Sequence, residues 1–589
     1  MNSKIVCIID SGCDIEHSVF KNIKILGKYS FLKKNNTIIV SNEISDYIGH
    51  GTAITSIIHL NSINTNYYII KIFDRSWECD DELLLYALNF IYKNIQCDYI
   101  NISCGITNSI KEKQLKEICD KIQKKGIVII SAFDNIGSIS YPAYFNSVIG
   151  VDTDTYCKNK ETYFFVENSN VNVFGYGNIQ RVAWLNKKFM IVNGSSFACA
   201  HITAILINSN AKGISNSLNY LKTNAKYVFN VEKKEDIKQK LFINSAIAIP
   251  FNKEIKGLID NISMLQFELK GVYDSPKLGN VGKEIKSLDN MSSVKIENIR
   301  DINWEEEFDT VIIGHMENIN IILGYDLRYQ ILLNAIKKNK TIYSFDKLNY
   351  DILINYKKIY YPEVIFNDKL FGKFFDIRTP VLGIFGTSSK QGKFTLQLAL
   401  RKRFIKDGYN IGQIGTEPSS ILFGIDETFH IGFNSDLKIE SSDFIQMINH
   451  KVKEIENNEV ELIIGGCQSN TIPYLLKNKK YLNSRQNEFL LGLNPDCVIL
   501  CINEHDDYNY IQRTINYIEG ITNAKVLALV LYPFGTNNQI FISKKNKLNK
   551  SEIEEIKSIM LERHKISCYS LENEDDINKL YYQIIDFFS

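Results

Sequence analysis

The stretch Lys4–Gly12, KIVCIIDSG, opens the chain with a short apolar run that ends in a carboxylate. The run Ile5–Ile9 is apolar throughout, which is typical of a strand buried on both faces of a covered parallel sheet. Asp10 would then lie at the carboxyl edge of that sheet, where the sites of open α/β folds form. The opening stretch therefore predicts a doubly wound α/β fold and the position of a site within it.

The rest of the first 230 residues continues this alternation of apolar runs and amphipathic segments. Apolar runs at Tyr68–Phe73, Tyr99–Ser103 and Ile127–Ala132 predict further buried strands. Amphipathic stretches at Asp81–Tyr92 and Ile110–Lys125 predict helices that cover them. Strands alternating with helices indicate an α/β class with a doubly wound parallel sheet.

A chain of 589 residues is too long for one hydrophobic core. The polar stretch Asn224–Lys240 predicts a first boundary, so that residues 1–230 form one α/β domain. A Rossmann-like α/β domain is expected at 240–375, and a third α/β domain at 376–589. Strands of these two domains are predicted at Ala246–Pro250, Leu265–Asp274, Thr310–Gly314, Thr341–Phe345, Val381–Phe385, Asn410–Gly415, Val460–Gly465, Asp496–Asn503 and Ala524–Tyr532.

The composition narrows the class of protein. The chain is 45% hydrophobic and 23% charged with a net charge of +1, so no global field favours nucleic acid or an acidic membrane. It holds no apolar run long enough for a transmembrane helix and no signal-peptide pattern at its start. The 12 cysteines include no Cys-x-x-Cys pair, and a reducing cytoplasm is the expected location.

Two further contexts complete a set of reactive side chains. His50 stands in the stretch GHGTA at residues 49–53, and Ser196 in the stretch NGSSFA at residues 193–198. Each is predicted to open a helix. A serine hydroxyl needs an imidazole to take its proton, and the imidazole needs a carboxylate such as Asp10 to fix its tautomer. The order Asp, His, Ser along the chain therefore predicts nucleophilic attack on an acyl group.

The same segments resemble the subtilisin-like serine peptidases, the subtilases, over roughly residues 1–210. The stretches DSGCDIEH at 10–17, HGT at 50–52 and GSSFA at 194–198 are similar to the family's aspartate, histidine and serine boxes. The resemblance implies a subtilisin-like fold and a serine endopeptidase. It implies no cofactor and no metal for that reaction.

The resemblance extends to residues around the reacting bond. The stretch 126–135 is similar to the strand that delivers the oxyanion-hole asparagine, and the family position falls on Asn135. Ser103, Cys104 and Gly105 resemble the strand edge that pairs with the substrate backbone and lines its first specificity pocket. The family pattern thus implies these three as substrate-binding residues.

Alternatives exist for several of these residues. His17 is expected to cap or satisfy a loop rather than to react. Ser195 stands where the family has threonine, which favours its neighbour Ser196 as nucleophile. Asp134 would repel an oxyanion. The main competing hypothesis is a subtilase fold that has lost activity. The chain also departs from the family at Ala200, because many members carry a proline there, before the histidine of the serine helix.

Only nine residues precede Asp10, whereas secreted subtilases carry a signal and a long inhibitory propeptide. Such an enzyme would fold without that chaperone and would be active inside the cell unless restrained. Restriction to a particular substrate is the expected consequence.

A second site is predicted where a glycine loop joins the apolar strand Val381–Phe385 to a helix. Phosphate-cradling loops require this context, because backbone N–H groups and the helix N-terminus then face the anion. Its expected cofactor-binding residues are Gly386, Thr387, Gly392, Lys393 and Thr395. The spacing is one residue longer between the glycines than in Gly-x4-Gly-Lys-Ser/Thr, and a glycine turn that merely caps a helix is the alternative.

Residues 245–530 resemble a bacterial P-loop family related in fold to dethiobiotin synthetase, some members of which are D-amino-acid N-acetyltransferases. The stretch DIR at 376–378, just before the P-loop strand, belongs to this likeness. The acidic residue usual in that family is replaced by Gly465 and Gly466, and Glu417 is a candidate substitute. The resemblance implies binding of ATP or another nucleotide with Mg²⁺, more readily than its turnover.

The segment 246–283 resembles proteins described as peptide-maturation factors in clostridial ribosomal-peptide clusters. The leading hypothesis is therefore an intracellular endopeptidase that removes the leader from a ribosomally made precursor, in a natural-product or bacteriocin maturation system. Its expected partners are that peptide or protein substrate and other maturation enzymes, not nucleic acid or membrane. The alternative is a nucleotide-dependent transferase, ligase or kinase with the subtilase part as a processing or docking module. A purely binding protein is the third possibility.

Overall fold

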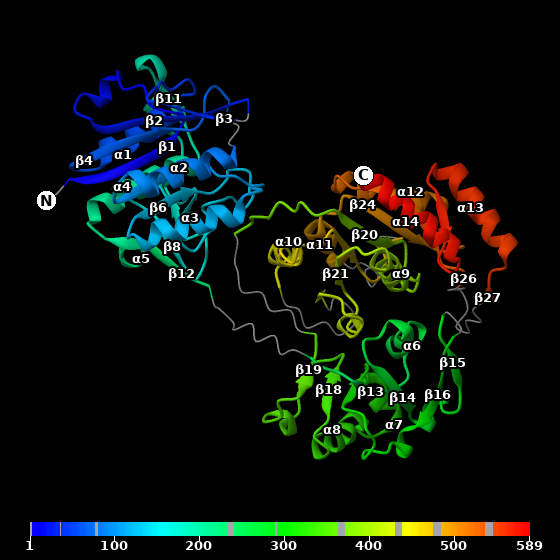
Figure 1. Cartoon of the computed structure of the whole chain (residues 1–589). Helices are drawn as coiled ribbons and strands as arrows, with labels where there is room; N and C mark the ends of the chain where they lie inside the picture. The colour runs from blue at the N-terminus through cyan, green and yellow to red at the C-terminus, as the bar shows by residue number, and fades with distance from the viewer. Residues whose placement is uncertain are drawn as a thin grey trace. The chain divides into compact units, whose positions relative to one another are not determined.

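The apolar run at the N-terminus forms strand β1 (Lys4–Asp10) in the computed structural model (Figure 1). The structure describes residues 3–35, 37–76, 80–231, 241–288, 291–362, 371–429, 439–474, 484–535 and 546–589. Part of the boundary predicted over 224–240 lies at 232–240, outside the described residues. One compact unit comprises Met1–Glu235 and Phe366–Asp376, and a second comprises Asp236–Ile365 and Ile377–Ser589.

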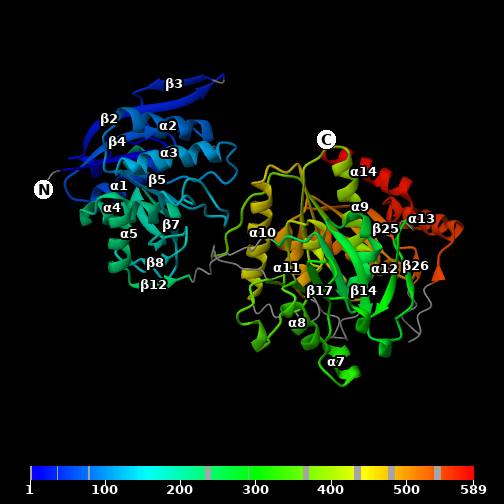
Figure 2. The same ribbon diagram turned by 60° about the horizontal axis from the view of Figure 1, so that its bottom comes forward.

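The first unit is built on a 10-stranded sheet in the order β12-β8-β9-β7-β6-β5-β1-β4-β2-β3. Neighbouring strands are parallel except in the pairs β2–β3 and β8–β9. The outer strand β3 is easily found in Figure 2. Besides β1, the strands of this unit are β2 (Lys24–Lys34), β3 (Thr37–Ser41), β4 (Thr65–Lys71), β5 (Tyr99–Ile102), β6 (Val128–Ala132), β7 (Val148–Thr153), β8 (Phe164–Glu167), β9 (Val173–Gly175) and β12 (Tyr227–Asn230), with a separate hairpin of β10 (Gln180–Ala183) and β11 (Phe189–Val192).

Helices cover both faces of this sheet, which is what its apolar strands require. One buried cluster joins the sheet to α1 (His50–Asn61), α4 (Ser195–Ser209) and α5 (Gly213–Asn224). Another joins it to α2 (Asp81–Asn94) and α3 (Glu112–Lys124). The predicted doubly wound α/β class is confirmed for this unit.

Two seven-stranded sheets form the second unit. The first has the order β15-β16-β14-β13-β17-β18-β19 and is parallel except for the pair β15–β16. Its strands and helices are β13 (Ser245–Ile249), α6 (Lys253–Asp260), β14 (Glu268–Asp274), β15 (Glu284–Lys286), β16 (Ser293–Asn298), β17 (Thr310–Ile313), α7 (Glu317–Leu323), α8 (Leu327–Lys337), β18 (Thr341–Ser344) and β19 (Ile359–Tyr360).

The other sheet of this unit has the order β22-β21-β23-β20-β24-β25-β28, and its neighbouring strands are all parallel. Within the described ranges, every helix is too short or too polar to span a bilayer. The elements of this part are β20 (Val381–Gly386), α9 (Lys393–Lys406), β21 (Ile411–Gly415), β22 (Glu427–Thr428), α10 (Ser441–Glu456), β23 (Leu462–Gly466), α11 (Ser484–Leu493), β24 (Cys497–Ile502), α12 (Tyr508–Ile521), β25 (Lys525–Leu531), β26 (Phe534–Gly535), β27 (Asn546–Lys547), α13 (Lys550–His564), β28 (Cys568–Ser570) and α14 (Glu574–Phe588).

The predicted strand at Tyr68–Phe73 starts earlier and ends earlier than expected, at Thr65–Lys71. Lys71 is buried at the strand's carboxyl end, where its Nζ donates a hydrogen bond of 2.6 Å to the Ser45 carbonyl. A hydrogen bond to a distant loop compensates the buried ammonium, and apolar periodicity cannot anticipate such a bond.

Candidate active site

Asp10 and His50 meet at the carboxyl edge of the first sheet. Asp10 is the last residue of β1 and His50 is the first residue of α1, and both are buried. The His50 Nδ1 atom lies 2.8 Å and 3.0 Å from the two carboxylate oxygens of Asp10. Because a carboxylate accepts hydrogen bonds, it holds the proton on Nδ1 and leaves Nε2 as the basic nitrogen.

A second buried carboxylate, which sequence reasoning missed, fixes the start of α1. Asp46 accepts from the backbone N–H groups of Ile48, Gly49 and Thr52 at 2.8–2.9 Å. It also accepts from the hydroxyls of Ser11 at 2.9 Å and Thr52 at 2.7 Å. These bonds satisfy donors at the helix N-terminus and favour a negative charge there. Asp46 therefore holds the turn that presents His50.

Ser196 lies in the first turn of α4, after Gly194, whose φ of 142° favours glycine. Its side chain is half-buried, and the Ser196 Oγ donates a hydrogen bond of 2.8 Å to the Ser103 carbonyl. The His50 ring packs against the next residue, Phe197, with 5.5 Å between ring centroids. The structure thus brings the three residues of the predicted set to one edge of the sheet.

A buried polar network ties the end of β5 to the beginning of α4. The Asn101 side chain is fully buried, and its Nδ2 donates to the Ser103 Oγ at 2.7 Å. That hydroxyl donates to the Ser196 carbonyl at 3.3 Å, while the Thr203 hydroxyl donates to the Asn101 Oδ1 at 2.8 Å. Asn101 falls within the predicted strand Tyr99–Ser103, but the sequence does not predict it as a site residue.

Asn135 lies in the loop after β6, close to the N-terminus of α4. Its Oδ1 accepts from the Ser195 backbone N–H at 2.9 Å and from the Ser195 hydroxyl at 3.0 Å. With the oxygen held in this way, the Nδ2 is the end of the carboxamide that can donate to a ligand. Ser195 itself is fully buried, and its one hydroxyl hydrogen is shared between this Oδ1 and the Phe133 carbonyl oxygen, which lies 2.5 Å from the Ser195 Oγ, an arrangement that suits a structural side chain.

The predicted substrate-binding residues follow β5 in an irregular segment. Cys104 and Gly105 are half-buried. A Cβ on Gly105 would lie 2.6 Å from the Ser140 Oγ, so a larger residue would collide with the facing loop. Ile106 and Tyr141 exchange backbone hydrogen bonds of 3.0 Å and 2.9 Å, which hold the two segments together.

The other histidines of this region make structural contacts. His17 caps a short 3₁₀ turn: its Nδ1 accepts from the Val19 backbone N–H at 3.3 Å, and its Nε2 lies 2.9 Å from the Lys188 carbonyl oxygen. His201 lies on α4 with its Nε2 2.8 Å from the Gln180 Oε1, and burial lowers the pKa of His201 to about 4.

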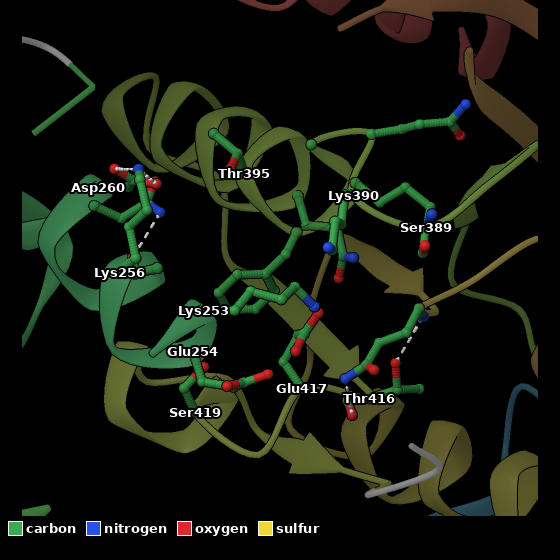
Figure 3. Close-up of a pocket in the computed structure, with 18 of the residues that line it drawn as sticks. Lys253, Glu254, Lys256, Asp260, Ser389, Lys390, Thr395, Thr416, Glu417 and Ser419 are labelled. Carbon is green, nitrogen blue, oxygen red and sulfur yellow. Dashed lines mark hydrogen bonds and ion pairs between the residues drawn. The ribbon is translucent and has the colours of Figure 1, made fainter. Parts of the chain in front are cut away.

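The second predicted site lies between β20 and α9, beside a cavity of about 380 Å³ (Figure 3). Gly392, Lys393 and Thr395 line this cavity, whereas Gly386 and Thr387 are not among its lining residues. The Thr387 hydroxyl instead donates to the Asp506 carboxylate. A volume of this size is in the range of small-molecule sites.

The loop closes on its own side chains. Lys393 is buried, which lowers its pKa, and its Nζ donates to the Ser388 carbonyl at 2.6 Å. The Gln391 Oε1 accepts from the Ser388 N–H at 2.8 Å, and Lys390 has a φ of 64°. Lys390 thus takes a left-handed backbone conformation within a loop that is one residue longer between its glycines than Gly-x4-Gly-Lys-Ser/Thr. A bound phosphate would have to replace the bonds at Ser388.

The opposite wall of the cavity comes mainly from helix α6. Lys253 and Glu254, at the start of α6, line it together with Glu417 from the loop after β21. Figure 3 shows side chains from α6 and from the glycine loop around one hollow. Burial raises the pKa of Glu417, and the charges of Lys253 and Lys393 act in the opposite direction.

Two family models match parts of the chain. The subtilase family model matches residues 2–225. A P-loop domain of unknown function, DUF1611, matches residues 370–556.

Curated relatives match the first of these parts. The major intracellular serine protease of Bacillus subtilis (strain 168) is 27% identical over 218 residues, which are 34% of this chain and 66% of that protein. Subtilisin DY of Bacillus licheniformis is 27% identical over 212 residues, which are 33% of this chain and 73% of that protein. The chain thus spans just under two thirds of the first relative.

Solved structures of similar proteins include three proteases. A cold-adapted subtilisin-like serine proteinase is 17% identical with a TM-score of 0.32, covering 38% of this chain and 82% of its own. The prenylagaramide maturation protease PagA is 18% identical with a TM-score of 0.27, covering 35% and 74%. A lanthipeptide protease is 15% identical with a TM-score of 0.31, covering 37% and 79%. By the family models alone, residues 2–225 match the subtilase family and residues 370–556 match a P-loop domain of unknown function.

Proposed function

We propose that the chain is a serine endopeptidase in which Ser196 is the nucleophile, His50 the general base and Asp10 its orienting carboxylate. The observation that carries the proposal is the 2.8 Å contact between the Asp10 carboxylate and the His50 Nδ1 at the start of α1. The His50 ring also packs against Phe197, the residue after Ser196. In this arrangement Nε2 is the nitrogen that can accept the serine proton.

The first half of the reaction forms an acyl-enzyme. A hydroxyl has one hydrogen, so the Ser196 O–H first turns from the Ser103 carbonyl toward His50. His50 Nε2 takes this proton while Oγ bonds to the scissile carbonyl carbon. The imidazolium then gives the proton to the leaving amine as the C–N bond breaks. In the second half, His50 takes a proton from water, whose oxygen attacks the ester carbon. The imidazolium then returns that proton to the Ser196 Oγ as the ester C–O bond breaks and the acid product leaves.

The negative oxygen formed in each half needs donors that are already in place. The Asn135 Nδ2 and the Ser196 backbone N–H, in the first turn of α4, are the proposed pair. Such donors act without reorganisation at the moment of reaction.

Replacing Asn135 by alanine is expected to lower kcat about 100-fold to 1000-fold with little change in KM, because one oxyanion donor is lost. Steady-state hydrolysis of a fluorogenic peptide measures this. The neighbouring Ile136, which is 91% exposed, gives the matched control Ile136→Ala, with wild-type kinetics expected. Wild-type kcat in Asn135→Ala would contradict the assignment of the donor.

For the natural substrate we infer a ribosomally made peptide precursor, whose leader is cut off inside the cell. The support is the resemblance of residues 246–283 to peptide-maturation factors. The test is mass spectrometry of the purified chain incubated with precursor peptides encoded next to it and with unrelated peptides of equal length. Cleavage at one internal bond of the precursor supports this substrate. Equal cleavage of the unrelated peptides would contradict it.

A second candidate function belongs to the cavity beside the glycine loop: a nucleotide-dependent transferase, ligase or kinase. The favouring observation is that Lys393 and Thr395 line the cavity together with Lys253 of helix α6. Lys393 and the loop N–H groups would hold phosphates. The Thr395 hydroxyl and the Glu417 carboxylate both line the cavity and are oxygen donors of the kind that Mg²⁺ prefers. Magnesium there would neutralise phosphate charge.

Replacing Lys393 by alanine is expected to weaken the binding of Mg-ATP about 10-fold to 100-fold, because a charge-assisted hydrogen bond to phosphate is lost. Isothermal titration calorimetry measures the affinity. The control is Lys402→Ala, an exposed lysine further along the same helix, with unchanged affinity expected. Equal affinity of the wild type and the Lys393→Ala variant would argue for a plain scaffold.

A further inference from the structure

Residues 371–376, here called the anchor segment, lie far outside the matched subtilase residues 2–225 and yet belong to the first compact unit. They directly precede Ile377, where the second unit resumes, and β20 starts at Val381. The anchor segment packs on the loop that carries Asn135.

Main-chain hydrogen bonds attach the anchor segment to the residues that follow Asn135 in the sequence. The Phe374 N–H donates to the Gly137 carbonyl at 3.0 Å, and the Ile139 N–H donates to the Phe374 carbonyl at 2.7 Å. Phe374 is thereby paired with Ser138 in a parallel bridge. This attachment begins two residues after Asn135.

Lys373 attaches the anchor segment to the residues that precede Asn135 in the sequence. Its side chain is only 5% exposed, and its Nζ lies 2.7 Å from the Asp152 carboxylate. The same Nζ donates to the Asp134 carbonyl at 3.4 Å and lies 5.3 Å from the centre of the Phe133 ring. A buried ammonium is stable only when it is paired in this way, so the lysine is fixed in place.

Aromatic contacts hold both ends of the anchor segment. Phe375 is buried and packs edge-on against Tyr144, with 5.1 Å between ring centroids. Phe371 packs edge-on against Phe174 at the same separation of 5.1 Å. The segment is therefore a packed part of the first unit on both sides of Lys373.

We propose that the anchor segment is a positioning element for the oxyanion hole, with Lys373 and Phe374 clamping the loop 134–139 on both sides of Asn135. The proposal rests on the proposed peptidase function. Asn135 is exposed, and besides the bond of its Oδ1 to the Ser195 N–H its place depends on the backbone that carries it. Small displacements of a catalytic donor reduce turnover strongly.

The clamp residues belong to the stretch that matches the P-loop domain, although they would position a residue of the peptidase site. Lys373 and Phe374 fall within residues 370–556, which match the P-loop domain and not the subtilase model. The N-terminal match alone would thus lack a piece that holds its oxyanion donor.

The test is a double-mutant cycle in the full chain. Lys373→Met keeps the length of the side chain and removes its charge, and we expect kcat to fall about tenfold to 100-fold at unchanged KM. In the Asn135→Ala background the same change should have almost no further effect, because the positioned donor is already absent. Lys222→Met, which breaks the partly exposed ion pair of Lys222 with Glu167, is the control and should leave kcat unchanged.

A merely structural role of Lys373 would instead lower kcat by the same factor in both backgrounds, and that result, or a wild-type kcat in Lys373→Met, overturns the proposal. Should Lys373→Met fail to fold, Asp152→Asn removes the partner charge and is expected to show the same pattern.

Hydrogen exchange separates this proposal from the peptidase assignment. The amides of residues 134–140 should exchange faster in Lys373→Met than in the wild type if the clamp exists, whether or not the chain cleaves peptides. Unchanged exchange there overturns the clamp, whereas absence of peptide cleavage by the wild type would overturn the proposed function alone.

Discussion

Replacement of Ser196 by alanine is expected to lower kcat for peptide hydrolysis about a millionfold, to the level that binding and the oxyanion donors alone can sustain. The reason is that the methyl group cannot form the acyl-enzyme. Of the two neighbouring serines in the first turn of α4, Ser195 is buried and Ser196 is half-buried. Initial rates on a fluorogenic peptide, with active-site titration of the wild type, measure the loss.

Ser195→Ala is the matched control for this variant. Its hydroxyl supports the Asn135 carboxamide, but the Ser195 backbone N–H continues to donate to the same oxygen at 2.9 Å. A loss of about tenfold is therefore expected, from one hydrogen bond of ordinary strength. A larger loss in Ser195→Ala than in Ser196→Ala would exchange the roles of the two serines.

Replacement of Asp10 by asparagine is expected to lower kcat about 10⁴-fold. The amide has nearly the same shape, so the Ser11 N–H can still donate to its oxygen. Its NH₂ group would then stand in place of Oδ2, which lies 3.0 Å from the His50 Nδ1, and would donate to that nitrogen. This moves the imidazole proton to Nε2 and removes the base.

Asp14→Asn is the control for the loss of a carboxylate in the same stretch. The Asp14 side chain accepts from the Asn186 N–H at 3.1 Å, a bond that asparagine can keep. Near wild-type kcat is expected for Asp14→Asn. Asp10→Asn with a kcat within tenfold of the wild type would refute the orienting role of Asp10.

The fold class could be predicted because the first unit's parallel sheet is covered on both faces. Strands such as β5, which is entirely buried, then appear in the sequence as uninterrupted apolar runs. The hairpin of β2 and β3 could not be predicted in this way. Its side chains include exposed apolar residues such as Ile39 and Val40, so the pattern of burial there does not follow hydrophobicity.

The candidate site could be predicted only where a short local stretch of sequence is typical of a site residue. Asp10, His50 and Ser196 each stand in a short context of glycine and small residues, and the roles assigned to them stay predictions. Lys373 has no such context, because its partner is a carboxylate more than 200 residues earlier in the chain. Asp46 also has a distant partner, the Ser11 hydroxyl, besides the nearby N–H groups of its own turn. Side chains that act through distant partners leave no local signal in one sequence.

The measurement that tests the central claim most directly is covalent labelling with a fluorophosphonate probe, followed by mass spectrometry of the labelled peptide. A hydroxyl activated by His50 should carry the label on Ser196 in the wild type and in Ser195→Ala, and the label should be absent from Ser196→Ala. Full labelling of Ser196→Ala, or none of the folded wild type at saturating probe, would contradict the account.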